Sequence, residues 1–163
     1  MMLPQFLVIA AIAAWVLWKA YVYYFTIASN PELIQPSLED VTQDMLHMRK
    51  PIVIAERVVD QRDLLKGIFK YEYSFCIESY NDIPRTCTAK YTLVFVKNAH
   101  EGFVLIDVLH PPTGRAIRVR LYNDQTLVLP PHWIYRPVQG AVHEWGLYDM
   151  LHATMWYCSK LWK

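Results

Sequence analysis

The chain has 163 residues, 54% of them hydrophobic and 14% aromatic, and its formal net charge at neutral pH is +1. This charge balance excludes a function that depends on a strongly basic surface, so no nucleic acid partner is expected. Without the apolar N-terminal segment, about 135 residues remain, which is enough for one domain with a hydrophobic core.

The first predicted element is an apolar helix over residues 5–28, in which Lys19 is the only charged side chain. Such a helix is about 36 Å long and can cross a hydrocarbon layer of about 30 Å. Its Leu, Ile, Val and Phe side chains together outweigh the roughly 3 kcal/mol that a central lysine costs on insertion. Residues 1–29 are therefore predicted to be a transmembrane anchor, and the protein a single-pass membrane protein. The residues assigned to the anchor are Phe6, Ile9, Ile12, Val16, Trp18, Lys19 and Tyr23.

Two other interpretations of this segment compete with an anchor. A cleaved signal peptide would carry basic residues before its apolar stretch, and no Lys or Arg precedes Lys19. A buried core helix is rarely the first element of a domain and rarely this uniformly apolar. The anchor is the preferred interpretation.

A linker and a short helix are predicted over residues 30–50. Asn30-Pro31 ends the first helix, and Ser37 followed by Asp40 has the pattern of a capping box, which predicts a helix that begins at Ser37. Pro51 ends this second helix.

Residues 51–140 are predicted to form a β domain, because the hydrophobic pattern changes there to a period of two. Strands are expected over residues 51–55, 68–78, 85–97, 102–109, 115–122 and 126–129, with a loop or one helical turn over residues 57–66. Short strands separated by turn-forming residues are typical of an antiparallel sandwich or barrel.

Residues 141–163 are predicted to form an apolar C-terminal helix, which begins at Val142. Its aromatic and aliphatic side chains extend beyond one narrow stripe, so the helix needs cover on more than one side. It packs on its own sheet, meets a neighbouring protein or lies against a membrane surface.

The three cysteines, Cys76, Cys87 and Cys158, do not form a spaced disulfide framework. If residues 68–78 and 85–97 pair as a hairpin with their apolar faces matched, Cys76 and Cys87 point to opposite sides of the sheet. The sequence therefore predicts free thiols and a reducing compartment.

One part of the chain resembles a known family. A helix, then KPIVI, then a run of short strands that ends in NDQTLVLPPHW is similar to the cupin and Jumonji-type double-stranded β-helix, over about residues 37–136. The resemblance implies a small antiparallel jelly-roll domain. Oxygenases of this family bind iron through an H-x-D/E pair and a distant histidine.

The iron ligands of that family have no match in this chain. Residues 130–135 match the family's Pro-Pro-x-Trp-Trp-His segment, so the position of the distant histidine holds Tyr135. None of the six histidines is followed by an acidic residue two places later. The resemblance thus implies the fold without the metal, and we expect no cofactor, no metal and no catalytic residue.

Candidate contacts with a partner or ligand come from one strand and from the segment after Pro131. Arg118 and Arg120 alternate with Ile117, Val119 and Leu121, so they project from one face of a strand. That face contacts an anion or an acidic protein, or it is a solvated outer face. His132 lines a small-ligand pocket, or it is a turn residue at the rim of the sheet. The candidate contact residues are Arg118, Arg120, His132, Trp133, Tyr135 and Arg136.

The plan of one anchor, one small jelly-roll domain and an apolar tail resembles the membrane-associated minor capsid proteins of large icosahedral DNA viruses. This resemblance implies a non-enzymatic structural protein that ties an inner membrane to the capsid, with lipid, other structural proteins such as capsid proteins and an oligomer of the chain as partners. Two alternatives stay open: a metal-dependent cupin-type oxygenase or isomerase with displaced ligands, and a membrane-bound module that binds a small ligand.

Overall fold

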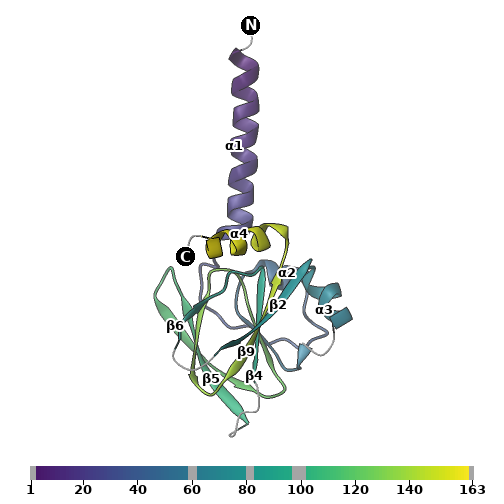
Figure 1. Cartoon of the computed structure of the whole chain (residues 1–163), viewed down its shortest axis with the longest axis vertical. Coiled ribbons are helices and arrows are strands. Elements are labelled where there is room, and N and C mark those ends of the chain that lie inside the picture. The colour runs from purple at the N-terminus through teal and green to yellow at the C-terminus, as the bar shows by residue number, and fades with distance from the viewer. Residues whose placement is uncertain (1–2, 59–61, 80–82, 97–101, 162–163) are drawn as a thin grey trace.

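The computed structural model describes residues 3–58, 62–79, 83–96 and 102–161, and it is mainly β (Figure 1). Its helices are α1 (Leu3–Phe25), α2 (Gln43–His47), α3 (Arg62–Phe69) and α4 (Met150–Leu161). Its strands are β1 (Ile52–Ile54), β2 (Tyr73–Ser79), β3 (Arg85–Thr86), β4 (Tyr91–Val96), β5 (Phe103–His110), β6 (Arg115–Tyr122), β7 (Thr126–Leu129), β8 (Ile134–Gln139) and β9 (Val142–Tyr148).

The strands form two antiparallel sheets that pack face to face. One sheet has the order β1-β7-β4-β9-β2 and the other the order β3-β8-β5-β6. Along β5, which belongs to the second of these sheets, buried and half-buried residues alternate strictly, so one side of the strand faces the first sheet. The predicted mainly β fold with antiparallel sheets is confirmed. The core between the sheets includes Val94, Val96, Val104, Ile106, Val108, Leu121, Leu127, Leu129, Trp133 and Tyr135.

The first sheet is covered on its other face as well. Leu46 of α2 and Leu65 and Phe69 of α3 pack there against Leu93 and other side chains of β1, β4 and β7. Because both faces are covered, β4 and β7 are buried at every position.

Two predictions about the segment before β2 are wrong. Ser37 and Asp40 form a turn, and the second helix begins only at Gln43, where Thr42 is the N-cap and its hydroxyl accepts a hydrogen bond from the Met45 amide. Where a loop or one helical turn was expected over residues 57–66, the structure has the eight-residue helix α3 over residues 62–69, and β2 begins at Tyr73 rather than at residue 68.

Two further predictions fail because long-range pairing decides the structure. The single strand predicted over residues 85–97 is replaced by two strands in different sheets, β3 and β4. In addition, β2 pairs with β9 instead of forming a hairpin with that segment. Residues 142–148 form β9 instead of the start of a helix, because they fit between β4 and β2. The C-terminal helix begins only at Met150.

The cysteines are free, as predicted, although the expected hairpin is absent. Cys76 and Cys158 are exposed and Cys87 is fully buried. Burial raises the pKa of the Cys87 thiol well above its usual value, and the nearby carboxylate of Glu144 raises it further.

The first helix extends away from the two sheets as a long rod (Figure 1). Leu7, Ile9, Ile12, Leu17 and Trp18 each expose more than half of their surface. The anchor residues Phe6 and Tyr23 lie outside the described side chains. Within the described part of the chain, no helix combines the length and the apolar character that crossing a membrane requires.

Candidate functional site

Residues 26–28, which follow α1 directly, are held to one end of the sandwich by hydrogen bonds, and we call these residues the base of α1. The Arg49 guanidinium donates from Nη1 to the backbone oxygen of Thr26 (2.5 Å) and to its hydroxyl (2.8 Å). His110 Nε2 lies 2.6 Å from the backbone oxygen of Ala28, so this nitrogen carries the hydrogen. Trp133 donates from Nε1 to the Arg49 carbonyl (3.1 Å) and lies beside the His110 ring. The base of α1 is therefore fixed to the domain, and we call this region the α1 end of the sandwich.

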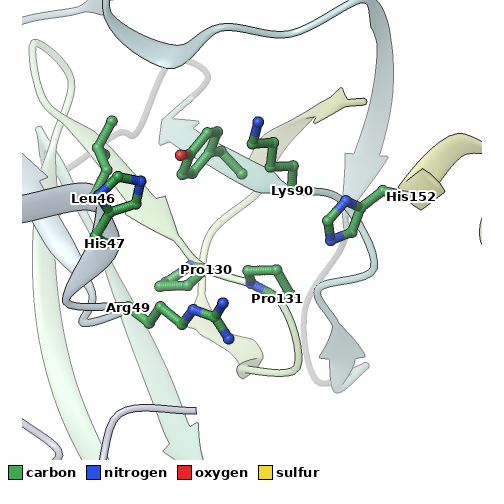
Figure 2. A pocket seen from close by; sticks show the side chains of 8 residues that line it. Leu46, His47, Arg49, Lys90, Pro130, Pro131 and His152 are labelled. Atoms are coloured by element: carbon green, nitrogen blue, oxygen red, sulfur yellow. The ribbon is translucent and has the colours of Figure 1, made fainter. Parts of the chain in front are cut away.

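A small pocket opens at the α1 end (Figure 2). Its volume of about 30 Å³ is large enough for water. Pockets for small organic ligands usually measure at least about 300 Å³, so this pocket does not support a ligand-binding module. The lining residues come from α2 and the segment after it, the segment before β4, the turn after β7, and α4. They are Leu46, His47, Arg49, Lys90, Tyr91, Pro130, Pro131 and His152.

Asp149 connects α4 to the rim of this pocket. Its Oδ1 lies 2.7 Å from His152 Nδ1 and accepts the His152 amide at 2.9 Å, while Lys90 Nζ lies 3.7 Å from Oδ2. Burial alone would raise the pKa of Asp149, but the hydrogen bonds from His152 and the charges of His152 and Lys90 hold that pKa below its usual range. The carboxylate therefore stays ionised and caps the first turn of α4.

Helix α4 lies across the α1 end of the sandwich (Figure 1). Two residues of this helix, His152 and Ala153, are buried against the domain. The Trp156 ring stacks on Phe75 with 5.2 Å between the ring centroids and meets the edge of Tyr148. One face of the C-terminal helix thus packs on its own sheet, which is the first of the three predicted possibilities.

Polar side chains meet in the interior where the cupin resemblance places the distant iron ligand. The Tyr135 hydroxyl donates to Glu144 Oε2 at 2.7 Å, and Arg85 Nη1 donates to the same oxygen at 3.0 Å. Tyr135 is fully buried and Glu144 nearly so. Arg85 and Tyr135 are direct cross-strand partners on β3 and β8, so their side chains leave the sheet on the same side.

This interior cluster does not fit an iron site. A facial iron triad requires two imidazoles and a carboxylate. Here the side chains are a phenol and a carboxylate that is already paired with a guanidinium. Over residues 3–58, 62–79, 83–96 and 102–161, no group of three His, Cys, Asp or Glu side chains is placed to hold a metal ion.

The predicted arginine face exists on the outer side of the second sheet. Arg118 donates from Nε and Nη2 to the two carboxylate oxygens of Asp107 (2.8 and 3.2 Å), and Arg136 Nη2 donates to Oδ2 (3.2 Å). Arg120 lies over the Phe103 ring, 4.8 Å from its centroid. Arg118 and Arg136 are thus brought together by an acid, whereas Arg120 stands apart from them.

A shallow groove lies next to this ion-paired cluster. It measures about 240 Å³, its lining is mostly apolar, and Asp107 and Arg136 are its charged lining residues. The apolar lining residues are Pro84, Leu109, Ala116 and Ile134.

The ion pairs of Asp107 predict a specific pH dependence of stability. The hydrogen bonds from Arg118, and then those from Arg136, hold the pKa of Asp107 below its usual range. A carboxylate with a lowered folded-state pKa stabilises the fold above its unfolded-state pKa of about 3.9, and this contribution disappears as the pH falls through the folded-state value. Thermal unfolding of the Asp107→Asn variant should therefore change less than that of the wild type between about pH 5 and pH 2. Equal pH dependence in the two proteins would contradict the assignment.

The other predicted contact residues lie away from the surface cluster. Trp133 and Tyr135 are fully buried in the core between the sheets, so neither side chain lies on the surface of the domain. His132 sits in a turn with φ of 71°, and its amide donates to the Cys87 carbonyl (2.8 Å). The interpretation of His132 as a turn residue is confirmed.

Several residues of the site were not predicted from the sequence. Asp107 could have been found, because it is an isolated acid on the outward side of an alternating strand, opposite Arg118. Arg49, His110 and Glu144 carry no comparable signal, since their partners lie far away in the sequence or in the facing sheet.

No protein-family model matches the chain, and no curated protein matches it significantly.

Proposed function

We propose that this protein is a non-enzymatic structural protein that α1 anchors in a lipid bilayer, and that its β domain docks onto other proteins. The observation that carries the proposal is the exposure of the apolar side chains of α1, which stands away from the sheets while its base is bonded to them. Its backbone of 23 residues extends over about 35 Å. The structure describes the side chains of residues 7–22 of this helix. The proposal extends the anchor to the remaining residues of α1 at both ends.

Lys19 is compatible with this anchor. Its ammonium lies 5.9 Å from the centroid of the Trp15 ring, one helical turn away. A lysine beside tryptophan and tyrosine rings suits the interface between hydrocarbon and headgroups, where a long side chain reaches toward water. Trp18 and Tyr21 stack on each other in the same half of the helix.

The strand order supports the docking part of the proposal. Four strands in the order β2-β9-β4-β7 face four in the order β3-β8-β5-β6, which is the arrangement of a jelly roll with β1 added at one edge. Minor capsid proteins of large icosahedral DNA viruses, which the plan of this chain resembles, are the specific case that we propose. In that case the domain would connect the inner membrane of the virion to the shell above it.

The anchor is tested by flotation with liposomes after an alkaline wash. The full chain should float with the lipid, and a variant that lacks residues 2–25 should remain with soluble proteins. Replacing those residues by an unrelated apolar helix of equal length should restore flotation. If the full chain is washed off the lipid, the anchor is wrong.

The docking part is tested by extraction from the native membrane with a mild detergent. We expect the protein to leave the membrane in a complex with other proteins. The variant Ala116→Arg, which places a long cation in the exposed groove, should lower the amount of this complex. Ala55→Arg is the matched control at another exposed alanine. Release of the wild type as a monomer would exclude docking and leave the anchor unaffected.

A further inference from the structure

We propose that the outward face of α4 lies in the lipid–water interface as a second membrane contact, so that the α1 end of the sandwich rests on the bilayer. This inference depends on the proposed anchoring by α1. It adds that the domain contacts lipid directly and therefore has a defined orientation on the membrane.

The first argument is the apolar character of the face of α4 that points away from the sheet. Each large apolar side chain on this face exposes at least 38% of its surface, and Leu161 exposes 83%. A helix on a water-soluble domain normally has polar residues on this side. The residues of the outward face are Met150, Leu151, Thr154, Tyr157, Cys158 and Leu161.

The second argument is that the hydroxyls of Thr154 and Ser159 in this helix already have hydrogen-bond acceptors within the helix. The Thr154 hydroxyl donates to the Met150 carbonyl at 2.8 Å, and the Ser159 hydroxyl donates to the Trp156 carbonyl at 2.7 Å. The helix contains no acidic residue, and its basic residue is Lys160 in the last turn. Moving the outward face into an interface with anionic headgroups therefore leaves the Thr154 and Ser159 hydroxyls paired and brings no acidic residue of this helix toward the lipid. The exposed Tyr157 suits such an interface, where a tyrosine ring lies against hydrocarbon and its hydroxyl reaches water.

The third argument is the position of α4 relative to α1. The base of α1 is bonded to Arg49, and Arg49 lines the same pocket as His152 of α4. The two helices thus share the α1 end of the sandwich, and α4 runs crosswise to α1 (Figure 1). If α1 enters a bilayer along its axis, α4 lies in the plane of the membrane surface with its buried face toward the sheets.

The experiment uses the exposed Cys158 as a probe in the full chain. With Cys76→Ser, an environment-sensitive fluorophore attaches to Cys158 alone, because Cys87 is fully buried. The reference protein carries Cys158→Ser as well and is labelled at Asp124→Cys, in the turn after β6. That turn lies one strand length, about 26 Å, from the turn at His110 that meets α1. Both proteins are placed in vesicles of neutral and anionic lipid, with and without nitroxide-bearing lipid.

We expect the label at Cys158 to shift its emission to the blue and to be quenched by the nitroxide lipid, and the label at position 124 to show neither effect. Met150→Glu with Leu161→Glu should return the Cys158 label to the emission that it has in water. Ile83→Glu, at an equally exposed apolar residue, should not.

Three results would overturn the inference, and they can be told apart. A label in water on protein that still floats with lipid refutes the contact of α4 but leaves the anchor intact. A blue-shifted label that nitroxide lipid does not quench shows that another protein or a second copy covers α4. Protein that does not float refutes the proposed function itself, and this inference with it.

Discussion

Replacing Trp133 by alanine is expected to lower the free energy of unfolding by about 4 kcal/mol, within the usual range for a large buried aromatic residue. The side chain is fully buried in the core between the sheets, and its ring lies 5.0 Å from that of His110. Its Nε1 donates to the Arg49 carbonyl, and Arg49 holds the base of α1. The variant should therefore lose core packing and also loosen the base of α1.

Trp133→Phe separates these two effects. It keeps much of the apolar volume but leaves the Arg49 carbonyl without its indole donor, which we expect to cost about 1 to 2 kcal/mol. Denaturant unfolding of the full chain in detergent micelles, followed by near-ultraviolet circular dichroism, measures both variants. A loss below about 1 kcal/mol for Trp133→Ala would mean that the site does not hold a packed indole.

Replacing Glu144 by alanine is expected to cost about 3 kcal/mol, because its carboxylate is the common acceptor of two side chains. Without it, the fully buried Tyr135 hydroxyl and the partly buried Arg85 guanidinium lose this charged acceptor. A buried donor that is left without an acceptor keeps its full cost of dehydration.

Tyr135→Phe is the matched control for this cluster. It removes one hydroxyl and leaves the pair between Arg85 and Glu144 in place, so we expect a loss of about 1 kcal/mol. The double variant should be less destabilised than the sum of the two single variants, because both remove the same hydrogen bond. Strictly additive losses, measured by unfolding in micelles, would show that the two side chains do not interact.

The fold was predictable where local pattern and final environment agree. The boundaries of β6 and β7 match the predicted strands, because turn-forming residues flank both strands. The helix predicted from residue 142 is wrong over β9, which lies between β4 and β2. Burial alternates over residues 142–146, but one of the buried positions holds the charged Glu144, so the hydrophobic pattern of the sequence does not show the alternation of a strand. The full length of α3 does not follow from the sequence, because its buried side chains, which include Leu65 and Phe69 one turn apart, lie within a charged stretch.

The candidate site was predictable only on its exposed side. The outward direction of Arg118 and Arg120 follows from strand alternation and is confirmed. The base of α1 depends on His110 and Arg49, which are separated from Ala28 and Thr26 by 82 and 23 positions. A periodic hydrophobic pattern in the sequence does not predict such long-range contacts, since these contacts exist only after the sheets have formed.

The attachment of α1 to the edge of one sheet has a mechanical consequence. Ile34 pairs with β1 through hydrogen bonds to Pro51 and Val53, and β1 pairs with the sheet only through β7. If the proposed anchoring and docking hold, a pulling force along α1 first loads the bonds of Thr26 and Ala28 to Arg49 and His110. Once these bonds break, the force is carried by the three-residue strand β1. We expect β1 to separate from β7 under force, while the central strands of both sheets keep their structure.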